Sequence, residues 1–151
     1  MAVVQDVFNS QPGTAYPGMV ANGETSNRIS RNVEDAAGIA FGAPVFAGAT
    51  DRGCTKTVKT VDDFLGFVMA DHGQPVVPGG PAADVLPQYR SAGIMDRGTI
   101  YVTVTGAGAK RALLYVAADG SLSTTSAGGV LTNWRLDDTI TGTGVARIGR
   151  R

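Results

Sequence analysis

Short apolar runs separated by turn residues constrain the fold of this chain more than any other feature of its sequence. The runs are four to eight residues long, and glycine, proline, asparagine or aspartate interrupts them about every ten residues. No segment keeps a helical period of apolar residues beyond two turns. The pattern predicts an all-β fold, a compact β-barrel or β-sandwich of short antiparallel strands. Strands are expected at residues 39–46, 54–61, 64–69, 99–105, 112–117, 121–124, 130–136 and 144–148.

The clearest strand signals lie in the C-terminal half. Residues 99–105 alternate with β-branched side chains, and residues 112–117 follow as another apolar run. Asp119-Gly120 then separates two extended runs, which predicts a hairpin with a type I′ turn. Residues 64–69 are continuously apolar, so we expect this strand to be buried on both faces.

The charged residues indicate a turn-rich chain whose surface suits protein contacts. Asp outnumbers Glu 11 to 2 and Arg outnumbers Lys 10 to 3, and there are 21 Gly and 7 Pro. Asp favours turns and caps, whereas Glu and Lys typically coat exposed helices. Arg suits interfaces because its planar guanidinium pairs with carboxylates and backbone carbonyls. Since the formal net charge is zero and the arginines are scattered, we do not expect a nucleic-acid partner.

Targeting and redox signals favour a protein made in a reducing cytoplasm and not secreted. No run of 18 apolar residues occurs, so we expect no membrane span and no membrane partner. The start of the chain, Met1 to Asp6, lacks the basic and apolar segments of a signal peptide. The single cysteine, Cys54, excludes an internal disulfide framework.

The first part of the chain differs from the rest, and we expect residues 1–37 to form an extended arm before a β domain at residues 38–151. Residues 9–35 are polar and rich in turn signals, as in segments without a core of their own. A frayed terminus is the alternative, but a spacer would not need the apolar side chains found here. An arm of this length spans at most on the order of 100 Å, enough to cross a subunit boundary. The residues predicted to contact a partner are Tyr16, Met19, Arg28, Ile29 and Arg31.

No catalytic constellation stands out, and we expect a protein without enzymatic activity, cofactor or bound metal ion. Cys54 and His72 are the only thiol and imidazole, so a Cys-His nucleophile pair is formally available, but nothing in the sequence brings the two together. They also cannot build a typical zinc site. Residues 105–111 lack the spacing of a phosphate-binding loop and are interpreted as a turn between strands. Trp134 is expected in the core rather than at an interface.

Seven short motifs follow one another along nearly the whole chain. They include a Tyr-Pro-Gly-Met stretch, an apolar strand with an internal Phe-Gly, an alternating Ile-Tyr-Val strand and a Tyr-Val hairpin that ends in Asp-Gly. Their positions are residues 15–21, 27–30, 39–45, 64–67, 98–104, 115–120 and 144–148. In this order the motifs resemble the capsid cement (decoration) proteins of tailed phages. The proline-rich loop at residues 72–89 and the terminal Arg150-Arg151 depart from the family pattern.

The resemblance implies a virion protein that binds the outside of an expanded icosahedral capsid and stabilises contacts between major capsid protein subunits. It also implies assembly in the host cytoplasm as a symmetric homo-oligomer, for which we prefer a trimer over a dimer. Weak contacts multiply when such an oligomer engages several subunits together. Two other interpretations remain open: another β-rich virion component, such as a head fibre or tail-tube protein, and a small β-barrel hydrolase.

Overall fold

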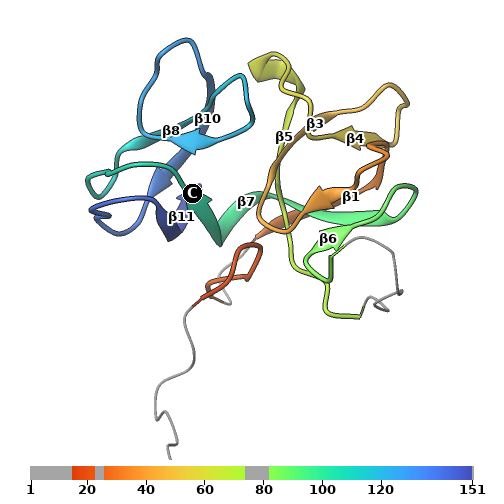
Figure 1. Ribbon diagram of the computed structural model, residues 1–151, viewed down its shortest axis with the longest axis horizontal. Helices are drawn as coiled ribbons and strands as arrows, with labels where there is room; N and C mark the ends of the chain where they lie inside the picture. Colours follow the sequence, from red (N-terminus) through yellow and green to blue (C-terminus); the bar gives the residue numbers. More distant parts are fainter. Residues whose placement is uncertain (1–14, 23–25, 74–81, 151) are drawn as a thin grey trace, which may run out of the picture.

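The computed structural model describes residues 15–22, 26–73 and 82–150, and this part of the chain is almost entirely β-structure (Figure 1). It holds eleven strands and one short 3-10 helix, so the predicted all-β class is confirmed. The elements are β1 (Asn27–Val33), β2 (Ile39–Ala40), β3 (Pro44–Ala47), β4 (Gly53–Thr55), η1 (Val61–Asp63), β5 (Phe64–Val68), β6 (Val85–Leu86), β7 (Ser91–Val104), β8 (Leu113–Val116), β9 (Leu122–Ser123), β10 (Val130–Leu136) and β11 (Gly144–Arg150).

Five of the strands close into a barrel. The sheet order runs β1-β4-β3-β5-β7, and β1 pairs back with β7 to complete the ring. β1 lies antiparallel to β7 over residues 27–32 and parallel to β4 over residues 32–33. Closure removes the free edges that an open sheet would expose to other chains. Of the two predicted architectures, the structure therefore has the barrel.

β7 is long enough to serve both halves of the molecule. Its 14 residues pair with β1 and β5 at one end and with β11 from Gly98 to Val104 at the other. From β11 the sheet continues through β10 and β8 to β9, and a parallel bridge between Thr105 and Ser123 returns it to the end of β7. Figure 1 shows the two halves side by side, with β7 passing from one to the other.

Buried apolar side chains form two clusters, and the first of them includes residues from both halves. Trp134 of β10 is fully buried, and its ring meets that of Phe67 from β5 edge to face, with 5.2 Å between ring centroids. Because β10 and β5 belong to different halves, this contact joins them into one packed unit. The prediction that Trp134 is a core residue is confirmed. The second cluster fills the five-stranded barrel with Val33, Ile39, Phe41, Val45, Cys54, Val68, Leu86, Ala92 and Ile94.

The hairpin predicted at Asp119-Gly120 is present, but its turn is not type I′. Gly120 has a φ of +83°, whereas Asp119 is not among the residues with positive φ. The N–H of Ala117 donates to the carbonyl of Ser121 (2.8 Å), and the N–H of Gly120 donates to the carbonyl of Ala117 (2.9 Å). The closed loop therefore contains three residues, and a three-residue loop needs only one left-handed residue.

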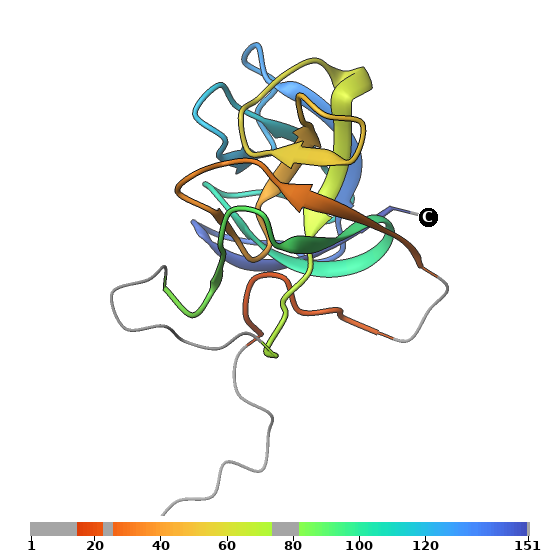
Figure 2. The same cartoon turned by 90° about the vertical axis from the view of Figure 1, so that its right-hand side faces the viewer.

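A large part of the predicted arm is built into the β-structure. Residues 27–33 form β1, and residues 18–21 run along β7 through backbone hydrogen bonds with Thr99 and Tyr101 (Figure 2). Residues 18–21 and 27–33 therefore belong to the β-structure, although the predicted boundary after residue 37 places them in the arm. The physical reason is that backbone pairing needs no apolar side chains, so a polar segment can still join a sheet.

The proline-rich loop at residues 72–89 contains a short strand. Val85–Leu86 pairs with Ile39–Ala40, and Leu86 is fully buried in the second cluster. Residues 74–81 of this loop, like residues 1–14 of the predicted arm, lie outside the described residues.

Candidate functional site

Tyr16 lies at an apolar pocket beside β7. Its hydroxyl oxygen is 2.7 Å from Nε2 of His72, and the two rings meet edge to face. The ring of Phe41 lies on another side of His72. Tyr16 is 40% exposed, so part of its ring is available to a partner. The pocket has a volume of about 470 Å³ and is lined by Tyr16, Pro17, Ala40, Phe41, His72, Ala83, Asp84 and Thr103.

Two other predicted contact residues, Met19 and Ile29, already make contacts within the fold. Met19 is half-buried, and its carbonyl accepts a hydrogen bond from the N–H of Tyr101 (2.9 Å). Ile29 is half-buried, lies opposite Ile94 in the β1–β7 pair and packs against the second cluster. The backbone of Met19 and the side chain of Ile29 therefore contribute to the fold, and both side chains are only partly exposed to a partner.

The two predicted arginines lie on opposite faces of β1. Arg28 is exposed, and its Nε donates to Oγ of Ser26 (2.9 Å). Arg31 is half-buried, and its Nη1 donates to the carbonyl of Ser30 (3.0 Å). Side chains three positions apart on a strand point to opposite faces. Tyr16 and Met19 lie in one turn, in which the N–H of Met19 donates to the carbonyl of Tyr16 (3.2 Å), whereas the two arginines point to opposite faces of β1.

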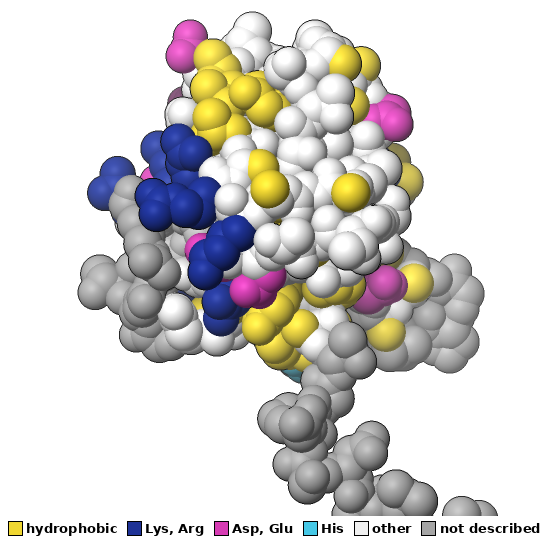
Figure 3. All heavy atoms as spheres, turned by 90° about the vertical axis from the view of Figure 1, so that its left-hand side faces the viewer, with side chains coloured by type: hydrophobic (Ala, Val, Ile, Leu, Met, Phe, Trp, Pro, Cys, Tyr) yellow, Lys and Arg dark blue, Asp and Glu magenta, His cyan; other side chains and the backbone are white. Residues whose placement is uncertain are grey.

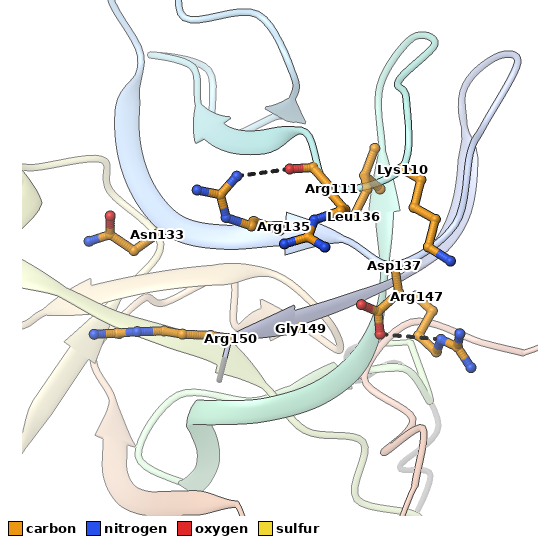
Figure 4. Close-up of a pocket in the computed structure, with 9 residues that line it drawn as sticks. All are labelled: Lys110, Arg111, Asn133, Arg135, Leu136, Asp137, Arg147, Gly149 and Arg150. Atoms are coloured by element: carbon orange, nitrogen blue, oxygen red, sulfur yellow. Dashed lines mark hydrogen bonds and ion pairs between the residues drawn. The ribbon is translucent and has the colours of Figure 1, made fainter.

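A second pocket, the basic pocket, is formed by β10, β11 and the loop between β7 and β8 (Figure 4). Its volume is about 420 Å³, and its lining holds five cationic side chains but a single carboxylate, that of Asp137. Figure 3 shows Lys and Arg side chains gathered on this side of the molecule. The lining residues are Lys110, Arg111, Asn133, Arg135, Leu136, Asp137, Arg147, Gly149 and Arg150.

Strand alternation directs the polar side chains into the basic pocket. On β10, Asn133 and Arg135 alternate with buried side chains and therefore point outward. On β11, Arg147 lies between buried neighbours in the same way. Gly149 faces Arg135 across the β10–β11 ladder. Because glycine has no side chain, the space opposite Arg135 stays open.

Ion pairs fix two of the five cations. Nε of Arg147 lies 3.4 Å from Oδ2 of Asp137, and its Nη2 lies 3.4 Å from Oδ1 of Asp138. Nη1 of Arg150 lies 3.0 Å from Oδ1 of Asp96. These pairs are partly exposed, so they orient the two arginines more than they stabilise the fold.

The other three cations have no carboxylate within ion-pair distance in the described part of the chain. The side chain of Arg135 donates to the carbonyl of Arg111 (3.0 Å), and the head groups of Lys110 and Arg111 are exposed. Arg111 and Asn133 have φ values of +70° and +62°, a region that residues other than glycine rarely adopt. Backbone strain of this kind often gathers where a surface has a binding role.

Part of this pocket could be predicted from the amino-acid sequence. Alternation around Trp134 predicts that Arg135 points outward, and the same logic applies to Arg147. Alternation does not predict that the two strands are neighbours, nor that Lys110-Arg111 lies beside them. The pocket therefore depends on strand pairing that local patterns do not encode.

The structure does not build a nucleophile from Cys54 and His72. Cys54 is fully buried, and burial, with the nearby carboxylates of Asp35 and Glu34, raises the pKa of its thiol to about 11. His72 is exposed and contacts Tyr16. Among the described residues no group of three His, Cys, Asp or Glu side chains could hold a metal ion. The same part of the chain has no helix of the length and apolar character that a bilayer span requires.

Comparison with known proteins found a matching family and similar solved structures. A family model described as "Structural cement protein (E217 gp24/Pam3 gp6)" matches residues 4–150. A solved structure described as the capsid of Myoviridae phage XM1 is similar to this chain, with a TM-score of 0.65 and 15% sequence identity. The alignment covers 99% of this chain and 97% of the other, so the two share a fold along their whole length. No curated protein matches the sequence.

Proposed function

The chain belongs to the structural cement protein family of phages, and from this membership we propose that it binds the outer surface of an icosahedral capsid and joins neighbouring major capsid protein subunits. It is a structural protein that binds and stabilises the capsid. The observation that carries the proposal is the family match, which spans residues 4–150 and therefore both halves of the fold. The proposed acting form is a homo-oligomer, a trimer in preference to a dimer, added to the shell in the host cytoplasm.

The closed β-structure supports a role as a clamp. A protein that holds subunits together must keep its own shape when the shell is under internal pressure. The ring of β1, β4, β3, β5 and β7 has no open edge, and the Phe67–Trp134 contact ties it to the other half. Densely packed cores deform little, so such a unit can transmit force between the subunits that it contacts.

We propose Tyr16 and Arg28 as the main shell contacts among the five residues predicted from the sequence, because both are exposed. Met19, Ile29 and Arg31 are half-buried and would contribute at the edges of the interface. Aromatic and arginine side chains are enriched among residues that dominate binding energies. Arg28 can also donate charge-assisted hydrogen bonds to shell carboxylates or carbonyls.

Tyr16→Ala and Arg28→Ala are each expected to weaken binding to expanded shells that lack the protein. Truncation of a central contact residue costs roughly 1–4 kcal/mol, or about a fivefold to several-hundredfold loss of affinity. Occupancy is measured by sedimenting shells with increasing protein and quantifying the bound fraction. Circular dichroism should stay unchanged, because neither side chain belongs to the buried core.

Two matched control variants distinguish the loss of a shell contact from an indirect effect of the substitution. Tyr16→Phe keeps the ring but removes the hydroxyl that meets His72, and it should bind nearly as wild type does if the ring makes the contact. Arg52→Ala removes an exposed arginine outside the predicted set and should leave occupancy unchanged. Wild-type occupancy for both Tyr16→Ala and Arg28→Ala would exclude these residues from the interface. A wild-type protein that fails to bind expanded shells would contradict the proposed function itself.

A further inference from the structure

We propose that the basic pocket binds an acidic segment of a neighbouring capsid subunit, one that presents several carboxylates. The proposal rests on the proposed function, because it names the chemistry of the partner at one contact surface. The contact residues predicted from the sequence lie on β1 and beside β7. The residues of the basic pocket are different ones, on β10, β11 and the loop between β7 and β8.

The charge balance of the pocket favours an acidic occupant. Five cations line it against one carboxylate, and Lys110, Arg111 and Arg135 have no carboxylate partner among the described residues. Like charges held close together raise the free energy of the folded chain, and an acidic ligand would relieve that repulsion. The chain as a whole carries no net charge, so this excess is local and not a general property of the surface.

The geometry suits carboxylates in particular. Arg147 and Arg150 are oriented by ion pairs with aspartates, which lowers the entropy lost when a ligand binds. A guanidinium group presents parallel N–H donors that match the two oxygens of a carboxylate. Gly149 has no side chain and lies directly across the ladder from Arg135, so the pocket keeps room beside Arg135 for such a carboxylate. The position above Gly149 itself borders the carboxylate of Asp137, so the ligand has to bind on the Arg135 side. In the view of Figure 4, Arg135 lies on one side of Asp137, and the head groups of Arg147 and Lys110 lie on the other.

A polypeptide fits this pocket better than a nucleic acid does. Single-stranded nucleic acids are usually held by aromatic side chains on which bases stack, and none of the described residues that line the pocket is aromatic. The carboxylate of Asp137 lies in the lining and would repel a continuous run of phosphates. Discrete carboxylates on a peptide can avoid Asp137 and still reach the surrounding cations.

The first test is the double variant Lys110→Glu with Arg135→Glu. Its affinity for expanded shells should fall by about tenfold or more, because two attractive contacts become repulsive. Wild-type binding should also weaken as the salt concentration rises from roughly 50 to 300 mM, because salt screens the attraction between the pocket and the acidic segment. The affinity of the double variant should depend much less on salt. The matched control is Arg52→Glu with Lys56→Glu, which changes net charge equally at exposed positions elsewhere. Equal loss in both double variants would show a net-charge effect and overturn the proposal.

An uncharged substitution at Gly149 tests whether shell binding needs the open space in the pocket. A Cβ atom at Gly149 would lie in ordinary contact with Asp137, 3.5 Å from Oδ1, and the backbone there is not in the left-handed region. Gly149→Ala should therefore fold, narrow the space beside Arg135 and weaken shell binding without any change of charge. Wild-type affinity for this variant, with an unchanged melting temperature, would overturn the proposal. This variant decides the matter even if the double variant fails to fold.

A direct probe identifies the chemistry of the occupant. In NMR spectra of the full-length protein, a polyglutamate peptide should shift amide signals of β10 and β11, and these shifts should be absent in the Lys110→Glu/Arg135→Glu variant. Shifts produced by a single-stranded oligonucleotide and not by polyglutamate would assign the pocket to nucleic acid and overturn the proposal. If wild type binds shells but its pocket variants bind equally well, this inference fails alone. If wild type does not bind shells, the proposed function fails and this inference fails with it.

Discussion

At single positions, backbone conformation decides which residues this chain can tolerate. Gly120 adopts a φ of +83° at the tip of the β8–β9 hairpin, and no heavy atom lies within 4 Å of the place where a Cβ would stand. Asn133 adopts a φ of +62° within a shift of register along β10, and asparagine tolerates this region better than most residues. Glycine at residue 120 is therefore required by backbone conformation and not by crowding.

Gly120→Val is expected to destabilise the protein by roughly 1–3 kcal/mol, because it forces a β-branched residue to a positive φ. For a chain of this size that corresponds to a fall of about 2–4 °C in melting temperature per kcal/mol, measured by calorimetry. Gly120→Asn is the matched control and should lose much less. An unchanged melting temperature for Gly120→Val would show that the turn does not hold residue 120 in the left-handed region.

At the scale of elements, one carboxylate connects the end of β1 to the loop between β3 and β4. Oε1 of Glu34 accepts hydrogen bonds from the hydroxyl (2.6 Å) and the N–H (2.9 Å) of Thr50, and Oε2 accepts one from the N–H of Ala49 (2.6 Å). A Cβ at Gly48 or Gly53 would collide with this carboxylate, which explains glycine at both positions. The loop therefore closes around Glu34 without any apolar core of its own.

The same contacts predict a pH dependence of this loop. Hydrogen bonds from Thr50 and then Ala49 hold the pKa of Glu34 below its ordinary value of 4.5. A lowered folded-state pKa means that the stabilisation is fully present above pH 4.5 and is lost as the pH falls through the folded-state value. Relative to the intrinsic exchange rate at each pH, the protection of the amides of Ala49 and Thr50 should fall over that acidic range. Glu34→Gln should show fast exchange already at neutral pH.

Asp51→Asn is the control for that experiment. Asp51 lies in the same loop, and its carboxylate accepts none of the hydrogen bonds made by Glu34. Its exchange profile should match that of wild type. High protection of Ala49 and Thr50 in Glu34→Gln, unchanged across the pH range, would show that the backbone alone holds the loop.

For the whole molecule, exposed apolar side chains and the arginine-rich surface favour self-association. Tyr89 is 83% exposed and has a φ of +66°, and Val61 and Val145 are also exposed. Large side chains held out in solvent are common at contacts between subunits. None of these three residues packs in the two buried clusters.

The purified protein is therefore expected to form a stable symmetric oligomer, with a trimer preferred over a dimer. Multi-angle light scattering should give about three times the 15.5 kDa of one chain. Tyr89→Ser should shift the equilibrium toward monomer if Tyr89 lies in the subunit interface. A monomer at roughly 100 µM, where even micromolar association would be nearly complete, would exclude a preformed oligomer.

Local patterns in the sequence determined many of the strands, but they did not predict β1 or β6, and the strand expected at residues 54–61 ends at Thr55. Residues 130–136 form a strand as predicted, and Trp134 is buried because it shares a face with Thr132 and Leu136. The Asp119-Gly120 hairpin was also predictable, although its turn type was not, because the extra residue in the loop depends on how Ala117 pairs with Ser121. Such features depend on near neighbours and on the alternation of a pleated strand.

Only the tertiary structure decided how those strands join. From its sequence, β1 is predicted to be part of a polar arm. In the structure it closes the barrel by pairing with β7, about sixty positions further along the chain. Backbone hydrogen bonds carry almost no sequence signature, so neither this pairing nor the docking of residues 18–21 follows from side-chain pattern. The basic pocket depends on the same pairing, since Arg111, Arg135 and Arg147 come from three separate segments. Each arginine is visible in the sequence, but their proximity exists only after β10 and β11 have paired.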